Sequence, residues 1–394
     1  MSDHATVIVA AKRTPIGAFQ GVFAAISAIE LGAAAIRAAL EASGIAAAEV
    51  QEVIMGCVLP AGLGQAPARQ AALGAGIPVG TPATTVNKMC GSGLKAIMQG
   101  ADQIRTGDAD IVVAGGLESM TNAPYLLPKA RSGYRMGHGQ IIDHMFYDGL
   151  QSPFDGELMG HFAERTAGRY EFSRADQDAF ATESVRRALA AIEAEYFLAE
   201  IAPVTVKSRK GTTVVARDET PFGCDISKIP TLKAAFAKDG TVTAASSSSI
   251  ADGAAAVVLM SEASARKRGI RPLARIVGYA SHAAEPEWFT TAPIGAIKKT
   301  VGQLMWRPEE VDLYEINEAF AVVTMATMRD VGIQHERVNV HGGACALGHP
   351  IGATGARILT TLAHALARRG HARGIASLCI GGGEAVAMAI ERGT

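Results

Sequence analysis

The stretch "RTGDADIVVAGGLESM" at residues 105–120 decides the fold, because a counterpart of it follows near the end of the chain. This counterpart, at 368–388, reads "RRGHARGIASLCIGGGEAVAM". A second pair, "AAEVQEVIMGCV" at 47–58 and "PEEVDLYEINEA" at 308–319, occurs in the same order. The displacement is about 261 residues for this pair and about 266 at the Gly-Gly of the other, which favours a duplicated unit. Any two βαβ units share Val-rich strands and Gly turns, so coincidence stays the alternative.

Each copy alternates short β-branched runs with alanine-rich stretches. Residues 6–11, 52–59 and 109–116 have the composition of buried strands. Residues 29–44 and 92–107 have apolar side chains at helical spacing, and a glycine closes each run. Strands that alternate with helices in this way predict an α/β fold whose sheet is covered on both faces.

The middle of the chain has a different amino-acid composition. Residues 119–248 are richer in polar residues, and Ser173 followed by Asp176 predicts the start of a helix. In the stretch 246–260, a turn rich in serine and glycine leads into a run with the composition of a buried strand. The turn either cradles a ligand or is simply a polar turn. We therefore predict an N-terminal half at 1–118 completed by 249–270, an insertion at 119–248, and a C-terminal half at 271–394.

Composition narrows the class of protein. The 394 residues carry a net charge of −1, which gives no reason to expect nucleic acid or an anionic membrane as partner. The five cysteines form no CxxC pair and no zinc-type spacing, which favours a reducing compartment. We see no signal peptide, no run near the ~20 apolar residues that span a bilayer, and no terminal Ser-Lys-Leu, and expect a cytoplasmic protein.

One thiol stands at an unusual place. In "VNKMCGSGLKAIMQG" (86–100), Cys90 comes just before a predicted helix, and Gly91 and Gly93 leave room for a substrate carbonyl. A helix start carries partial positive charge, which favours a thiolate nucleophile. The alternative is a small buried apolar residue, the usual state of cysteine.

Three further residues lie at inferred strand ends or glycine-rich turns. His349 precedes Pro350 and is either a base for a nearby thiol or an ordinary loop histidine. Cys379 ends a predicted strand before three glycines, where a strand-core role fits it better than a base on residue type alone. Asn317 either holds a water and donates to an oxyanion or is a turn residue. Ligands bind beyond the carboxyl ends of parallel strands, so these residues and Cys90 can share one crevice.

Several motifs in order give the whole chain a resemblance to the thiolase family, and within it to the acetyl-CoA acetyltransferases. They are "RTPIGAFQG", "NKMCGSGLKA", "GGLESMTNAPY", "LMGHFAE", "NEAFA", "GHPIGATGA" and "LCIGGG". The resemblance implies a five-layered αβαβα fold, made of two βαβαβαββ halves with a loop domain inserted in the first. It also implies a reversible, ping-pong Claisen condensation of two acetyl-CoA into acetoacetyl-CoA and CoA.

The same resemblance implies roles for particular residues. Cys90 matches the nucleophile that carries the acyl group, and His349 the histidine that activates it. Cys379 matches the cysteine that removes or returns the α-proton. Asn317 matches the residue that holds a water in one oxyanion hole. The backbone N–H groups of Cys90 and Gly381 match the other oxyanion hole.

Substrate contacts follow from the family as well, with the insertion 119–248 as the CoA-binding part. The residues implied in binding are Ser248, Met159, Ala319, Phe320, Leu150, Phe236 and Ala244. No metal and no permanently bound cofactor are implied, and CoA thioesters are substrate and product. The family forms homodimers or homotetramers, to which 125–145 can contribute contacts.

Some residues depart from the family pattern. "SSSS" at 246–249, Phe222, Leu158, and Glu384 with Ala385 differ from the common residues, and they leave open which acyl chain is preferred. A degradative 3-ketoacyl-CoA thiolase for longer chains is therefore the nearest alternative. A non-catalytic acyl-CoA or lipid-binding protein on the same scaffold is an alternative of another class. It would be expected to have lost the nucleophile or the base, and this chain keeps both. A decarboxylating condensing enzyme needs no second cysteine.

Overall fold

Ten strands form one large mixed sheet in the computed structural model, which describes residues 5–208 and 211–393. The strand order is β12-β13-β14-β11-β1-β10-β5-β3-β4, with β2 paired to β10. These strands span β1 Thr6–Arg13, β2 Gly17–Ala18, β3 Glu52–Gly56, β4 Ala83–Val86, β5 Ile111–Ser119, β10 Ala251–Ser261, β11 Ala274–Ala283, β12 Leu313–Ile316, β13 Arg373–Ile380 and β14 Glu384–Glu391. Two small hairpins add β6 Tyr125–Leu126 with β7 Ile142–Asp143, and β8 Val204–Ser208 with β9 Gly211–Val215.

The helices fall between and beside these strands. They are α1 Ala28–Ser43, α2 Pro67–Gly74, α3 Ser92–Thr106, α4 Met159–Tyr170, α5 Arg174–Glu193, α6 Glu262–Lys267, α7 Ala292–Leu304, α8 Ala321–Val331, α9 Ala344–Leu347 and α10 Thr354–Arg369. Short helical turns are η1 Ala47–Glu49, η2 Phe146–Leu150, η3 Thr220–Gly223, η4 Ile226–Thr231, η5 Pro286–Thr291, η6 Pro308–Glu310 and η7 His335–Arg337.

The same strand pairing occurs twice. From β1 the order runs antiparallel to β10, antiparallel to β5, then parallel to β3 and β4. From β11 it runs antiparallel to β14, antiparallel to β13 and parallel to β12, and a parallel Tyr314–Val338 bridge stands where the first copy has β4. Equivalent residues along β3 and β12, and along β5 and β13, are displaced by about 261 residues.

One detail of the sequence comparison is wrong. Matching the Gly-Gly pairs gave about 266 residues, but Gly115 and Gly116 lie inside β5, whereas Gly381 to Gly383 form the turn after β13. Gly382 and Gly383 have φ of 94° and 93°, a conformation that favours glycine. The glycines of the two halves therefore serve different purposes.

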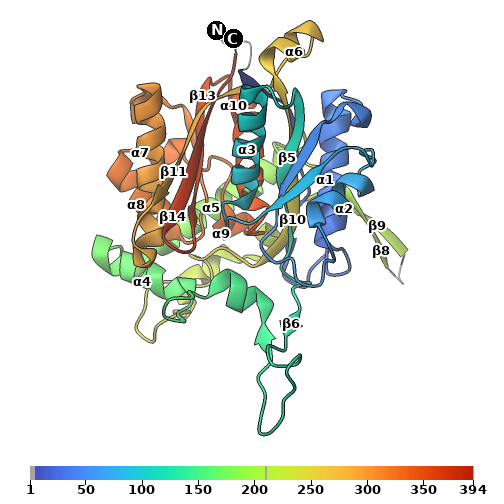
Figure 1. Cartoon of the computed structure of the whole chain (residues 1–394). Coiled ribbons are helices and arrows are strands. Elements are labelled where there is room, and N and C mark those ends of the chain that lie inside the picture. Colours follow the sequence, from blue (N-terminus) through green and yellow to red (C-terminus); the bar gives the residue numbers. More distant parts are fainter. Residues whose placement is uncertain (1–4, 209–210, 394) are drawn as a thin grey trace.

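The layers follow from this topology (Figure 1). Helices α3 and α10 lie between the two parts of the sheet, α1 and α2 cover one outer face, and α7 and α8 cover the other. The two parts meet where β1 pairs with β11 over two residues, Val7 with Arg275 and Ile8 with Ala274. The predicted five-layered arrangement is confirmed.

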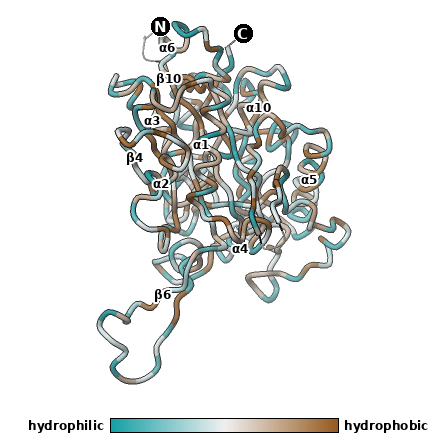
Figure 2. Tube along the Cα trace, turned by 90° about the vertical axis from the view of Figure 1, so that its right-hand side faces the viewer, coloured by the Kyte–Doolittle hydropathy of each residue, from teal (hydrophilic) through white to brown (hydrophobic). Residues whose placement is uncertain are grey.

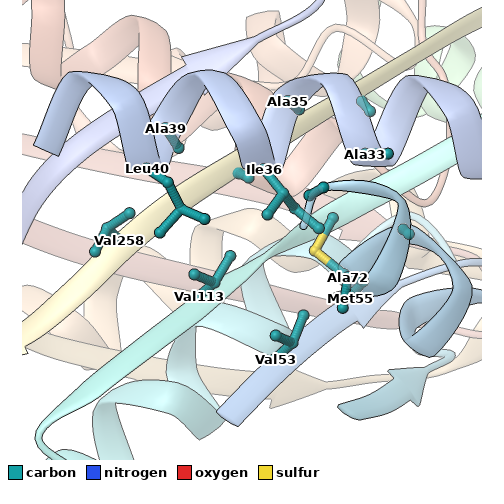
Figure 3. Close-up of a cluster of buried hydrophobic side chains, with 14 of the residues drawn as sticks. Ala33, Ala35, Ile36, Ala39, Leu40, Val53, Met55, Ala72, Val113 and Val258 are labelled. Carbon is teal, nitrogen blue, oxygen red and sulfur yellow. The ribbon is translucent and has the colours of Figure 1, made fainter. Parts of the chain in front are cut away.

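The helix predicted at 29–44 illustrates how the core forms. Ser27 and Glu30 make a capping box, and Gly44 ends α1 with φ of 68°. Figure 3 shows Ile36 and Leu40 directed from α1 onto the sheet, in one cluster with Met55, Val113 and Val258. Each such side chain, once buried, contributes about 1.5–3 kcal/mol to folding.

The segment between β5 and β10 adds α4, α5 and the two hairpins. The predicted N-cap is confirmed, because Ser173 accepts a hydrogen bond from Asp176 N–H at the start of α5. Between β6 and β7 the chain projects from the body of the molecule (Figure 2). Met136, on this projection, is 91% exposed. Along 5–208 and 211–393, no helix is both long and apolar enough for a transmembrane span.

Candidate active site

Cys90 lies in the turn between β4 and α3, as predicted. The turn is pinned by Ser92, whose hydroxyl accepts from Lys88 N–H (2.8 Å) and donates to Met89 O (2.6 Å). Met89 has a φ of 47°, which is unusual for a side chain of this kind. Helix α3 begins at Ser92 with Gly91 as its N-cap. The thiol is therefore held just before the first turn of the helix.

The pKa of Cys90 does not fall as its place at a helix start predicts. Burial raises the pKa of Cys90 to about 11, and the nearby Glu118 charge adds to the rise. Hydrogen bonds from the backbone N–H groups of Gly381 and of Cys90 itself act in the opposite direction. Desolvation thus outweighs these two hydrogen bonds. The two N–H groups that face the sulfur are those expected to form an oxyanion hole.

Cys379 approaches the same place from the other half of the fold. It is the penultimate residue of β13 and is fully buried. Burial raises its pKa well above the usual range, and the charge of Cys90 raises it further. Both thiols line the same cavity. The structure therefore brings together two sulfur atoms from opposite halves.

His349 is held in one tautomer. Its Nδ1 lies 2.6 Å from Thr354 Oγ1, and that hydroxyl gives its only proton to Pro350 O at 2.9 Å. Nδ1–H must therefore be the donor, which leaves Nε2 as an acceptor. Burial, followed by the charge of Arg357, lowers the pKa of His349 to about 3, so the ring is neutral at physiological pH.

Asn317 stands beside this ring and not in the cavity wall. Its Nδ2 is 3.5 Å from His349 Nε2, a long contact, and its Oδ1 is buried without a hydrogen-bond partner. A buried amide oxygen without a partner fits an ordered water at that position. This observation is consistent with the water-holding role that the family resemblance implies.

These groups surround one cavity of about 210 Å³. Nearly all predicted site residues line it: Cys90, His349, Cys379, Gly381, Ser248, Met159, Ala319, Phe320, Leu150 and Phe236. Asn317 lies behind His349, and Ala244 is exposed and outside the lining. The cavity is therefore formed by both halves and by the segment between β5 and β10.

One wall of the cavity is aromatic. Phe236 lies over Gly160, where a side-chain carbon would come within 2.3 Å of the ring. The ring of Phe320 meets Phe236 edge-on at 5.9 Å. Phe289 also lines this wall, and sequence analysis missed it because "PEWFTTAP" has no pattern of its own. Phe146 was missed too, although it lies only four residues before Leu150.

Of the residues that depart from the family pattern, Leu158 and Ser248 line the cavity, whereas Phe222, Glu384 and Ala385 do not. Lys88 forms an ion pair with Glu384 at 2.5 Å, linking the turns that carry Cys90 and Gly381. Leu158 lines the cavity, whereas Phe222 is 60% exposed in η3 and does not. As far as the structure describes the chain, it has no cluster of His, Cys, Asp or Glu suited to a metal ion.

Comparisons with known proteins agree with this geometry. Residues 6–263 match the model of the thiolase N-terminal domain, and residues 270–392 that of the thiolase C-terminal domain. An acetyl-CoA acetyltransferase of Pseudomonas aeruginosa is 52% identical over 98% of this chain and 99% of its own length. One from Escherichia coli is 50% identical over 98% of each. The crystal structure of the Bacillus anthracis acetyl-CoA acetyltransferase superposes with a TM-score of 0.96 at 43% identity, over 98% of both chains.

Proposed function

This chain belongs to the thiolase family, and from that premise we propose that it is an acetyl-CoA C-acetyltransferase. It condenses two acetyl-CoA into acetoacetyl-CoA and CoA, reversibly and through an acyl-cysteine. The observation that carries the proposal is the convergence of Cys90, Cys379 and His349 on one cavity with two backbone N–H donors. A binding protein without catalysis has no need of that set.

The first half of the reaction acylates Cys90. His349 Nε2 accepts the thiol proton while the sulfur attacks the thioester carbon of acetyl-CoA. The N–H groups of Cys90 and Gly381 already point at this sulfur, so they meet the oxygen that becomes negative beside it. Each such donor is worth about 10²–10³ in rate. The CoA thiolate then departs.

The neutral state of Cys379 gives it two successive roles. Because its pKa lies well above the usual range, it is a thiol at rest and gives its proton to the departing CoA sulfur. The resulting thiolate, buried and poorly solvated, takes the α-proton of the second acetyl-CoA. The enolate carbon attacks the acyl group on Cys90, and protonated His349 returns its proton to the Cys90 sulfur. Both cysteines end as thiols, so the cycle closes.

His349 and Asn317 act on the second thioester as well. The N–H of protonated His349 and a water held by Asn317 donate to the oxygen of the enolate. The remaining lining residues, Met159, Phe236 and Phe320 among them, enclose the acyl group and exclude bulk water. Ser248 and Leu150 line the same cavity and contact the pantetheine arm, whereas Ala244 contacts CoA outside the cavity.

The cavity favours a short acyl group. Its volume of about 210 Å³ equals roughly seven water molecules at ~30 Å³ each, and four phenylalanine rings line it. A longer ketoacyl chain would have to displace those rings. A thiolase for longer chains, which uses the same catalytic residues, is the second candidate, and cleavage rates on ketoacyl-CoAs of increasing length decide between the two.

Two variants test the catalytic roles. We expect Cys90→Ser to form no acetyl-enzyme from labelled acetyl-CoA. We expect Cys379→Ala to accept acetyl on Cys90 far more slowly than wild type, yet to accumulate it because condensation is blocked. Condensation by Cys379→Ala at near wild-type rate would refute the assignment of the base, and an acetylated peptide other than that of Cys90 would refute the assignment of the nucleophile.

Organisation and location complete the proposal. We divide the chain into 1–118 completed by 249–270, the CoA-binding insertion 119–248, and 271–394; β10, which pairs with β1 and β5, supports the first boundary. All five cysteines are free thiols, which supports a cytoplasmic location. The exposed projection around Met136 supports a homodimer or homotetramer. CoA thioesters are its only small-molecule partners in this proposal.

A further inference from the structure

The segment 343–352 carries His349 into the cavity, and although Pro350 restricts its backbone beside His349, three of its residues are glycines. It contains Gly343, Gly348 and Gly352, and Gly348 has a φ of 101°. A histidine that must receive a proton from a thiol works only within a narrow range of positions. The backbone hydrogen bonds of the segment therefore reveal what holds His349 in place.

The far end of the segment is held by Glu118. This carboxylate in β5 is fully buried, and its Oε2 accepts from Gly352 N–H at 2.9 Å. The same carboxylate accepts from Val58 N–H (2.9 Å) and Leu59 N–H (3.1 Å). A side-chain carbon on Gly352 would come within 2.6 Å of Glu118 Oε2, so the backbone approaches the carboxylate directly.

The near end of the segment is held by Glu318, a carboxylate that is 1% exposed. Its Oε2 accepts from Cys345 N–H at 3.1 Å and from Ser184 Oγ at 2.6 Å. Ser184 in turn accepts from Gly343 N–H at 3.0 Å. Between the two ends, His349 N–H donates to Ser249 O at 2.9 Å.

We infer that Glu118 and Glu318 are positioning residues that clamp the two ends of segment 343–352 and thereby fix His349 relative to Cys90. The inference rests on the acyl transfer proposed above. Glu118 belongs to the first half of the fold and Glu318 to the second, so both halves fix the position of His349. Within the described chain no ion pair involves either carboxylate. Burial without a paired cation is costly, and the backbone N–H donors are what offset it.

The charge environment supports this arrangement. Burial raises the pKa of Glu118 to about 7, while the N–H groups of Val58, Leu59 and Gly352 oppose the rise. Burial also raises the pKa of Glu318, against Ser184, Asn339, Cys345 N–H and the charge of Arg357. In both cases a backbone N–H group of segment 343–352, Gly352 for Glu118 and Cys345 for Glu318, is among the groups that favour the carboxylate.

The test compares two reactions of the same thiol in the full-length enzyme. Acetylation of Cys90 by acetyl-CoA needs His349, whereas alkylation by iodoacetamide needs only the thiolate. We expect Glu118→Gln and Glu318→Gln each to slow acetylation about 10- to 100-fold, as a displacement near 1 Å would. Alkylation should stay within threefold of wild type for Glu318→Gln. For Glu118→Gln it should stay equal or rise, because a negative charge near Cys90 is lost.

Controls separate the possible failures. Glu41→Gln, an exposed carboxyl on α1, should leave both rates unchanged. Ser184→Ala removes the hydroxyl that links Glu318 to Gly343 but keeps the bond from Cys345 N–H to Glu318, and it decides the matter if a glutamine variant does not fold. We expect at least threefold slower acetylation and unchanged alkylation. Acetylation within threefold of wild type in the glutamine variants, or acetylation and alkylation slowed by one common factor, would overturn the inference. Failure of the wild-type enzyme to be acetylated would instead refute the proposed function.

Discussion

The reactivity of Cys90 toward iodoacetamide should depend steeply on pH. With a pKa of about 11, on the order of one Cys90 in 10³ is ionised at pH 8, whereas about one ordinary thiol in four is. We therefore expect alkylation at pH 8 to be about 10²-fold slower than that of a free thiol. The rate should rise about tenfold per pH unit between pH 7 and 10.

His349 should contribute nothing to this profile. Its pKa of about 3 lies below the whole range, so its ring carries no charge that could stabilise a thiolate. In His349→Asn, which roughly keeps the side-chain volume, the alkylation rate should rise with pH in the same way and stay within about threefold of the wild-type rate at each pH. The same variant should lose about 10²–10⁴ in the rate of acetylation by acetyl-CoA, because that step needs the base.

The assay is mass spectrometry of the Cys90 peptide after timed exposure to iodoacetamide, which separates Cys90 from the half-buried Cys224. Denatured protein gives the rate of an unperturbed thiol and serves as the control. A plateau in the wild-type rate below pH 8 that disappears in His349→Asn would refute the reasoning. It would mean that the two residues form a thiolate–imidazolium pair before any thioester binds.

Three other changes test the packing around the site. Gly116→Ala should abolish activity and lower the melting temperature, because its side-chain carbon would lie 2.1 Å from Gly352 O. The matched change Gly168→Ala, in α4 with open space around it, should stabilise the protein by about 0.5–1 kcal/mol. Equal melting temperatures for the two variants would contradict both expectations. Phe236→Ala opens the cavity wall, so the ratio of kcat/KM for a six-carbon ketoacyl-CoA to that for a four-carbon one should rise at least ~10-fold. An unchanged ratio would mean that other residues select the chain length. Arg13→Met leaves two buried carboxylates without their cation and should lower the free energy of unfolding by about 3–5 kcal/mol, measured with denaturant. A loss of less than about 1 kcal/mol would contradict this expectation.

Local sequence patterns predicted what local physics controls. Helices expected at 29–44 and 92–107 are found at Ala28–Ser43 and Ser92–Thr106, because apolar spacing, capping and a closing glycine all act within a few residues. The place of Cys90 before α3 followed from the same rules. The duplication was visible because each half must build the same strand order from similar strands.

Long-range burial could not be predicted in this way. The partners of Arg13 lie 187 and 205 residues away, and nothing around Arg13 in the sequence marks it as a buried cation. The carboxylate of Glu118 depends on Gly352, 234 residues further on. The pKa of Cys90 was expected to fall because the helix start is a local feature, but the burial that raises it comes from residues distant in the sequence, such as Leu59, Met145 and Ile351.

The neutral resting site has a consequence for the order of chemical events. Cys90 and Cys379 are both thiols and His349 is an uncharged imidazole, so these three groups carry no charge at physiological pH. Charge therefore has to appear only when a thioester supplies an oxygen that the N–H groups of Cys90 and Gly381 can stabilise. A thiolate formed earlier would pay the desolvation cost without that compensation. Proton transfer to His349 is thus coupled to attack on the substrate, which keeps both thiols unreactive until a thioester is bound.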